Sequence, residues 1–161
     1  FMVNNFTLSK QNLSSGRFHT IITHALSHNE PVHLLMNLST LLSSAPEAGI
    51  RLNSRLLFWL LYTSSAVAGA AASLWARRGI SFQSIGASGA LYGVVAFVVS
   101  VSGGQQRVLW FGLELSAAQA LVANLVVSAG LLGEQSGMDL AMHLGGALWG
   151  AVAFPRLFGM L

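Results

Sequence analysis

The sequence predicts an all-α protein, a bundle of helices that cross a membrane. Of its 161 residues, 53% are hydrophobic and only 8% are charged, whereas an average soluble domain carries about 25% charged residues. The mean hydropathy is +0.63, and long apolar runs are separated by short polar or basic segments. The strands of a membrane barrel are alternating segments of about 10 residues. These runs are longer and do not alternate, so helices are predicted.

Five apolar runs are candidates for membrane spans, each of which needs about 20 mostly apolar residues, with about 17–25 tolerated. The first is short and carries a histidine and an asparagine, and the second is the cleanest. The predicted spans cover residues about 31–46, 56–75, 86–102, 116–132 and 139–155. The length suits one domain. We therefore expect a membrane domain over residues 31–161, preceded by an N-terminal segment and first loop at residues 1–30.

The segments between the runs are polar or basic, as connectors between spans are. They read EAGIRLNSR, ARRGISFQSI, GGQQRVLWFGLEL and GEQSGM. Basic residues divide evenly between the two sides of the membrane, so the positive-inside rule does not choose an orientation. The net charge of +3 is scattered along the chain, so no nucleic-acid partner is expected. Without cysteine there is no disulfide and no thiolate metal site.

Two glycine patterns indicate where helices touch. Gly89 and Gly93 in the third run, and Gly146 and Gly150 in the fifth, are each four residues apart. Small residues at this spacing let two backbones approach closely in a membrane. The pattern predicts that the third and fifth spans pack together, which would bring a serine of the third near a histidine of the fifth.

That pair, Ser88 and His143, combines a nucleophile with a base inside apolar spans. A serine hydroxyl is a weak nucleophile until an adjacent base takes its proton, and imidazole takes up protons near neutral pH. Each residue alone also has a structural interpretation, as a serine bonded to its own helix or a packed histidine. Polar residues at membrane depth usually face the bundle interior or a cavity; the others are His33, Asn37, Tyr92 and Asn124.

A catalytic triad would need a third group that orients the histidine. The single aspartate, Asp139, precedes His143 by one helical turn, but an aspartate there is commonly a helix cap. A Ser–His dyad is the simpler hypothesis. Tyr92 lies one turn after Ser88 on nearly the same face, where it either stacks on the imidazole or fills space between helices.

Acyl chemistry at a serine also needs donors for the developing oxyanion. His33 and Asn37 are four apart and share one helix face, and the Ser88 amide, at a helix start, is a third donor. His24, His28 and His33 also suggest metal ligands, but the segment lacks the H-E-x-x-H pattern of a zinc protease. We therefore expect no metal and no cofactor.

Three separated motifs resemble those of the rhomboid intramembrane proteases, over roughly residues 17–155. They are HALSHNEPVHLLMNL at 24–38, GASGALYG at 86–93 and AMHLGGALWG at 141–150. The resemblance implies Ser88 as nucleophile, His143 as general base, and His33, Asn37 and the Ser88 amide as oxyanion donors. It also implies that Tyr92 packs on the histidine, with Gly86, Gly89, Gly146 and Gly150 in supporting positions. The amino-acid sequences GASGA and HLGGAL within these motifs look most similar to those of the mitochondrial, PARL-like branch.

The chain departs from the family pattern in three places. Rhomboids have a six-helix core, whereas five spans are visible here. The first-loop Trp-Arg pair of many bacterial members is Gly16-Arg17, and Glu47 is followed four residues later by Arg51. No signal or transit peptide is visible. We expect the chain to be a fragment whose upstream part, including one helix, is missing.

The function expected is intramembrane serine endopeptidase activity on transmembrane segments of protein substrates, in a multi-pass protein of a lipid bilayer. The mitochondrial inner membrane is one candidate location, and the oligomeric state is not determined by the sequence. One alternative is a catalytically inactive, rhomboid-like protein that binds membrane clients. Another is a small transporter or channel whose intramembrane histidine and asparagine line a pathway, although this leaves the glycines around Ser88 unexplained.

Overall fold

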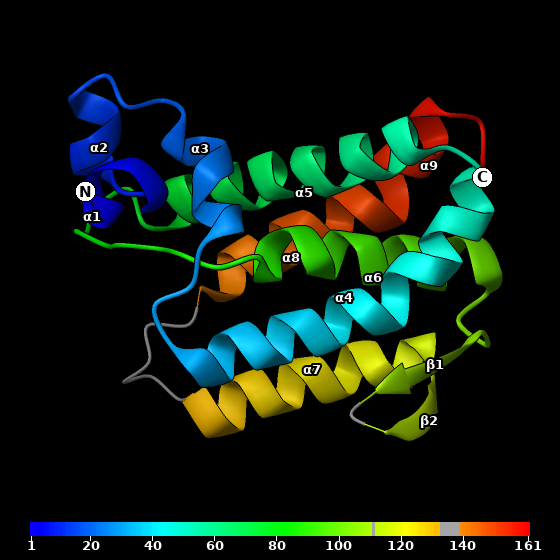
Figure 1. The fold of residues 1–161 in the computed structure, drawn as a ribbon. Helices are drawn as coiled ribbons and strands as arrows, with labels where there is room; N and C mark the ends of the chain where they lie inside the picture. The colour runs from blue at the N-terminus through cyan, green and yellow to red at the C-terminus, as the bar shows by residue number, and fades with distance from the viewer. Residues whose placement is uncertain (111, 133–138) are drawn as a thin grey trace.

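The protein is a bundle of helices with one small hairpin of strands (Figure 1). The computed structural model describes residues 1–110, 112–132 and 139–161. The long helices are α4 (Pro31–Leu52), α5 (Arg55–Ala76), α6 (Ser88–Ser102), α7 (Ala117–Leu132) and α8 (Leu140–Leu148). A π-helical turn at Trp149–Ala153 and a short helix α9 (Phe154–Leu157) continue α8. Helix is thus found in all five predicted runs.

Several short elements were not predicted. The N-terminal segment folds into α1 (Met2–Phe6), α2 (Lys10–Ser14), α3 (Thr20–Thr23) and a 3-10 turn at His24–Leu26. The connector before α7 contains an antiparallel hairpin of β1 (Arg107–Trp110) and β2 (Leu113–Ser116). The class is helical as expected, with this hairpin as its exception. The predicted connector GEQSGM lies outside the described residues.

The first predicted span, residues 31–46, ends too early, because α4 continues through Pro46 to Leu52. A proline inside a helix removes one backbone hydrogen bond, and helices of membrane proteins tolerate that loss. Beyond it, Arg51 bonds Glu47 at 2.8 Å one turn earlier, a pairing that supports helix. The helix stops at Asn53, which adopts the left-handed conformation (φ 45°) and donates its N–H to Gly49 O.

Helix α6 lies in the middle of the bundle, and its residues Gly89–Val98 are all buried. A helix buried on every side must be apolar all round, which explains why this run shows little polar patterning. It packs against α4, α5 and α8 (Figure 1). Helices α4 and α7 lie side by side below it, joined by a hydrogen bond from Thr40 Oγ1 to Asn124 Oδ1 of 3.2 Å.

The predicted contact between the two glycine patterns is confirmed. A Cβ atom added to Gly146 would lie 2.0 Å from Gly89 O, and one added to Gly150 would lie 1.9 Å from Gly93 O. Any side chain larger than hydrogen at these positions would collide with backbone. The glycines therefore set the distance between α6 and α8, and with it the distance between the residues that these helices carry.

Among the described residues, one helix, Arg55–Ala76, is both long and apolar enough to cross a membrane on length and composition alone. The helices Ser88–Ser102 and Ala117–Val126 are apolar but shorter. The multi-pass arrangement therefore remains a prediction from the sequence. Large apolar side chains are exposed on several helices, among them Leu42, Trp59 and Leu148.

Candidate active site

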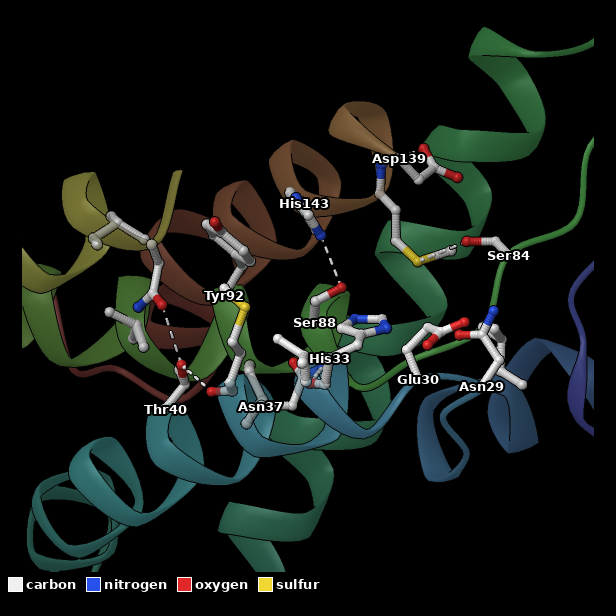
Figure 2. Close-up of a pocket in the computed structure, with 18 of the residues that line it drawn as sticks. Asn29, Glu30, His33, Asn37, Thr40, Ser84, Ser88, Tyr92, Asp139 and His143 are labelled. Atoms are coloured by element: carbon white, nitrogen blue, oxygen red, sulfur yellow. Dashed lines mark hydrogen bonds between the residues drawn. The ribbon is translucent and has the colours of Figure 1, made fainter. Parts of the chain in front are cut away.

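Ser88 and His143 meet inside the bundle (Figure 2). Ser88 is the first residue of α6, and its Oγ lies 2.7 Å from Nε2 of His143 on α8. His143 is only 5% exposed. The pair is therefore a hydrogen-bonded hydroxyl and imidazole, 55 residues apart in the chain, in the geometry of a nucleophile and its base.

The ring of Tyr92 lies against the imidazole. The two ring centroids are 4.3 Å apart and the planes differ by 18°, which is a stacked arrangement. Within the described part of the chain, His143 Nδ1 has no hydrogen-bond partner. The imidazole plane is therefore fixed by stacking and by the bond to Ser88, with no carboxylate bonded to its second nitrogen.

Asp139 caps α8, and its carboxylate makes no hydrogen bond to the His143 ring. Its Oδ1 accepts the N–H of Met142 at 3.0 Å, and its Oδ2 accepts the hydroxyl of Ser73 from α5. The guanidinium of Arg77 also lies nearby, with Nε 3.8 Å from Oδ1. The cap interpretation of Asp139 is thus the one that the contacts support. It anchors the start of α8, one turn before His143, to the end of α5.

The backbone in front of Ser88 is shaped by Gly86, whose φ of +129° is rarely adopted by residues with a side chain. A Cβ atom on Gly86 would lie 2.5 Å from Cε1 of His33. The glycine therefore lets the His33 ring approach the serine loop. Its own N–H donates to the carbonyl of His24 at 2.9 Å, which ties this loop to the segment before α4.

His33 and Asn37 both face the same cavity as Ser88 (Figure 2). They are one turn apart on α4, and Asn37 Nδ2 donates to the carbonyl of His33 at 2.9 Å. The same nitrogen also lies 3.0 Å from Nε2 of His28. The backbone N–H of Ala87 donates to that Nε2 at 3.3 Å. The structure thus brings His33 and Asn37 to the cavity beside Ser88 and places His28 next to them as an acceptor.

Sequence reasoning considered His28 as a metal ligand and as part of the motif at 24–38, without giving it a role of its own. No group of three or more side chains suited to a metal is found in the portion of the chain that the structure describes. The His28 and His33 rings instead meet edge to face with centroids 5.1 Å apart. Burial lowers the pKa of His28, and positive charge on His33 lowers it further. A neutral His28 is the form that accepts hydrogen bonds at Nε2.

His24 is fully buried just before α4. Its Nδ1 lies 3.0 Å from the carbonyl of Thr20. Burial lowers the pKa of His24, against opposing contributions from the backbone of Thr20 and Ile21 and from Asp139. His24 is therefore a neutral core histidine whose carbonyl supports the serine loop.

The cavity around the pair has a volume of about 630 Å³ and lies between α4, α6, α7 and α8. Its wall is mixed: Ser88, His33 and Glu30 are polar, while Leu91 and Val95 are apolar. At its far end lie Thr40 and Asn124, and Asn124 Oδ1 also accepts the indole N–H of Trp110 at 3.2 Å. The sequence analysis identified Asn124 as a polar residue within an apolar span. Nothing in the sequence around Thr40 or Trp110 predicted that they would bond it.

Comparison with known protein families gives a match to the rhomboid domain over residues 15–159. The chain is 35% identical to "Rhomboid protein 1, mitochondrial" of Saccharomyces cerevisiae over 139 residues, which cover 83% of this chain and 40% of that protein. It is 26% identical to "RHOMBOID-like protein 12, mitochondrial" of Arabidopsis thaliana over 98% of this chain and 52% of that protein. The chain thus spans about half, or less, of the length of these relatives. No solved structure matches it significantly.

Proposed function

The chain belongs to the rhomboid family, and from this premise we propose that it is an intramembrane serine endopeptidase. Ser88 is the nucleophile and His143 the general base in this proposal. The observation that carries it is the 2.7 Å contact between Ser88 Oγ and His143 Nε2. That distance is within the reach required for direct proton transfer between a hydroxyl and its base.

In the first step, Ser88 Oγ attacks the carbonyl carbon of the scissile peptide while its proton passes to His143 Nε2. The tetrahedral intermediate collapses, the C–N bond breaks, and His143 returns the proton to the leaving amine. Water then attacks the acyl-enzyme, again giving a proton to Nε2, and the acid product leaves as Ser88 regains its hydrogen. Every proton in this cycle moves through one ring nitrogen.

His143 works in this scheme without a carboxylate partner. Stacking on Tyr92 holds the imidazole plane, with ring centroids 4.3 Å apart, and Asp139 holds the start of α8 through the Met142 amide. Among the described residues, Nε2 bonds Ser88 and Nδ1 has no hydrogen-bond partner, which supports a dyad.

Three donors surround the position of the oxyanion. The Ser88 amide is the first N–H of α6, which an α-helix leaves without an internal partner. The His33 ring lies against Gly86, two residues before the nucleophile, and the Asn37 amide lines the same cavity. Donors fixed in a water-poor site stabilise developing charge at little cost in reorganisation.

The substrates in this proposal are transmembrane segments of proteins in the same bilayer. A helical substrate has its backbone bonded internally, so it must unwind locally before its carbonyl reaches Ser88. The polar part of the cavity, near Ser88, His33 and Glu30, admits the water that deacylation consumes. Both relatives named above are called mitochondrial, so we assign the chain to a mitochondrial membrane.

The test is cleavage of a reporter with one transmembrane segment by the purified chain in detergent micelles. Ser88→Ala and His143→Ala should each abolish cleavage, while Ser100→Ala, which alters a serine bonded to its own helix backbone, should retain it. A fluorophosphonate probe should label the parent and not Ser88→Ala. Undiminished cleavage by Ser88→Ala would refute the dyad, and client binding by a folded but unlabelled parent would favour an inactive binding protein.

A further inference from the structure

A second cavity, of about 470 Å³, lies where α4 ends and α5 begins. Its lining combines small and aromatic residues with polar ones, among them Ala45, Gly49, Ser54, Arg55, Phe58 and Trp59. No described residue lines both this cavity and the one that contains Ser88. The turn between α4 and α5 is at the end of the bundle away from the N-terminal helices (Figure 1). The second cavity is therefore separate from the candidate active site.

The depth of this cavity in a bilayer follows from the helix that it borders. Helix α5 begins at Arg55 and is the described helix that is long and apolar enough to cross a membrane. Its 22 residues span about 33 Å, and the hydrocarbon core of a bilayer is about 30 Å thick. A helix of this length that crosses the bilayer places its first residue at the headgroup layer. Arg55 and the cavity beside it therefore lie at that layer.

The tryptophans of α5 agree with this depth. Trp59 lies one turn inside Arg55 and is 56% exposed, and Trp75 lies near the other end of the helix and is 71% exposed. Arg77 and Arg78 follow Trp75, just as Arg55 precedes Trp59. Tryptophan is enriched at membrane interfaces, and arginine extends its charged group to the headgroups. Both ends of α5 thus have the residue order of a helix that crosses a membrane.

The apolar part of the cavity is open. A Cβ atom added to Gly49 would meet nothing within 4 Å, so this glycine leaves space on the α4 side. On the α5 side, the ring of Trp59 meets the rings of Phe58 and Tyr62 edge to face, with centroids 5.9 Å apart in each pair. These contacts hold the indole in place. An open hollow with small and aromatic walls, placed in a bilayer, suits a hydrocarbon chain.

The polar part of the cavity suits an anion. Arg55 is exposed, and no ion pair of its guanidinium is found among the described residues. Ser54 Oγ accepts the N–H of Leu57 at 3.3 Å, which leaves its own hydrogen for another acceptor, and Asn53 adds an amide. In the parts of the chain that the structure describes, no carboxylate lines this cavity. It therefore offers donors to a phosphate and no partner to an ammonium group.

We propose that this cavity binds a phospholipid of net negative charge, with the phosphate at Arg55 and one acyl chain against Gly49 and Trp59. Arginine matches the geometry of phosphate oxygens, and basic pockets between membrane helices suit lipid headgroups. The inference rests on the membrane placement in the function proposed above and not on catalysis. A soluble anion would use the polar part of the cavity alone, and an uncharged lipid the apolar part alone.

The experiment measures the quenching of Trp59 fluorescence by lipids with brominated acyl chains, added to the purified chain in detergent micelles. Phosphatidylglycerol supplies a negatively charged headgroup, and phosphatidylcholine with the same chains supplies one of zero net charge. The Trp59 signal is the difference between each protein and its Trp59→Phe counterpart, because the chain has four tryptophans. Thermal unfolding in the same micelles reports whether each variant is folded. If Arg55→Gln is not folded, Arg55→Met takes its place.

In the parent, half-maximal quenching should need about tenfold less phosphatidylglycerol than phosphatidylcholine, since hydrogen bonds to charged groups are worth about that factor. Arg55→Gln should reduce this preference to about twofold or less. The matched control is Arg107→Gln, which changes an exposed arginine outside the cavity lining and should keep the preference. Gly49→Leu fills the hollow and should weaken quenching by both lipids about tenfold, whereas Gly49→Ala adds one methyl group and should resemble the parent.

Three results would overturn the inference: equal affinity of the parent for the two lipids, an unchanged preference in Arg55→Gln, or the same loss in Arg107→Gln as in Arg55→Gln. Relief of the quenching by excess glycerol 3-phosphate would also overturn it, because the polar part would then be a site for a soluble anion. Unchanged quenching in Gly49→Leu would show that the chain does not enter the hollow, and would refute the site as described.

The two proposals fail separately. If the parent shows the lipid preference that depends on Arg55 but neither cleaves the reporter nor reacts with the fluorophosphonate probe, the lipid site stands and the proposed function fails. If the parent cleaves the reporter but shows no such preference, the endopeptidase function stands and the lipid site is refuted.

Discussion

Replacing Gly146 by alanine should separate α8 from α6 and thereby move His143 away from Ser88. The added Cβ would lie 2.0 Å from the carbonyl oxygen of Gly89 and 2.9 Å from its carbonyl carbon. Both atoms belong to the backbone of a buried helix, so no side-chain rotation relieves the collision. The helices themselves must move.

The size of that movement follows from the distances. Contacts of Cβ atoms under 3.0 Å are essentially never found in real structures, so the helices must separate by about 1 Å where they now touch. The hydrogen bond between Ser88 and His143 is 2.7 Å long, and a useful one extends to about 3.2 Å. A separation of about 1 Å exceeds this tolerance, and misplacement on that scale can lower a rate about 100-fold.

The matched control is Gly49→Ala, because a Cβ atom at this glycine of α4 meets nothing within 4 Å. The assay measures kcat and KM for the membrane reporter, together with unfolding by denaturant in micelles. We expect Gly146→Ala to lower kcat about 100-fold and to cost about 1–3 kcal/mol of stability. Gly49→Ala should keep the parent's activity and gain up to about 1 kcal/mol from better helix propensity.

Parent-like activity and stability in Gly146→Ala would refute the reasoning, since it would mean that α6 and α8 are not held at this distance. Loss of both properties in Gly49→Ala as well would show that any added methyl is harmful, which removes the specific role of the α6–α8 contact. The informative result is a large difference between the two variants.

Two further predictions concern the supports of the site. Asp139→Ala should lower the unfolding free energy by about 1 kcal/mol, because it removes the side-chain cap on the Met142 amide. Asp139→Ser should retain most of that stability. Equal stability of the alanine variant and the parent in denaturant titrations would contradict the cap. Burial lowers the pKa of both His24 and His28 below the ordinary value of 6.5, so the unfolded chain binds more protons than the folded one in slightly acidic solution. Their stabilising contribution is complete above about pH 6.5 and is lost as the pH falls through the lowered pKa values. Unfolding midpoints measured from about pH 7.5 to about pH 5.5 should therefore fall less steeply for His24→Gln than for the parent, and parallel curves would exclude this source of acid sensitivity.

Much of the candidate site was predictable because it depends on local sequence patterns. The glycine spacing around Ser88 and after His143 predicted that their helices touch, and the two backbones meet without collision only because both sides are glycine. Four-residue spacing likewise placed Asn37 beside His33 and Tyr92 beside Ser88. The family resemblance drawn from these motifs is confirmed by the match over residues 15–159.

Other features depended on contacts between distant segments or on signals too weak to read. The length of α4 was underestimated because proline is a strong local signal for a helix end, whereas the pair of Glu47 with Arg51 continues the helix past it. The hairpin of β1 and β2 was missed because two strands of four residues have too little alternation to be recognised. Its Trp110 bonds Asn124 of α7, which no local periodicity encodes.

The sequence by itself predicted the helical class and the meeting of Ser88 with His143, because helical periodicity and motif spacing are properties of contiguous residues. The tertiary structure decided the long-range contacts of Asp139 and His28. Besides capping α8 locally, Asp139 accepts the hydroxyl of Ser73, 66 residues away, and His28 accepts the N–H of Ala87, 59 residues away. Hydrogen bonds between such distant segments depend on how the chain packs, and no spacing within the sequence specifies them.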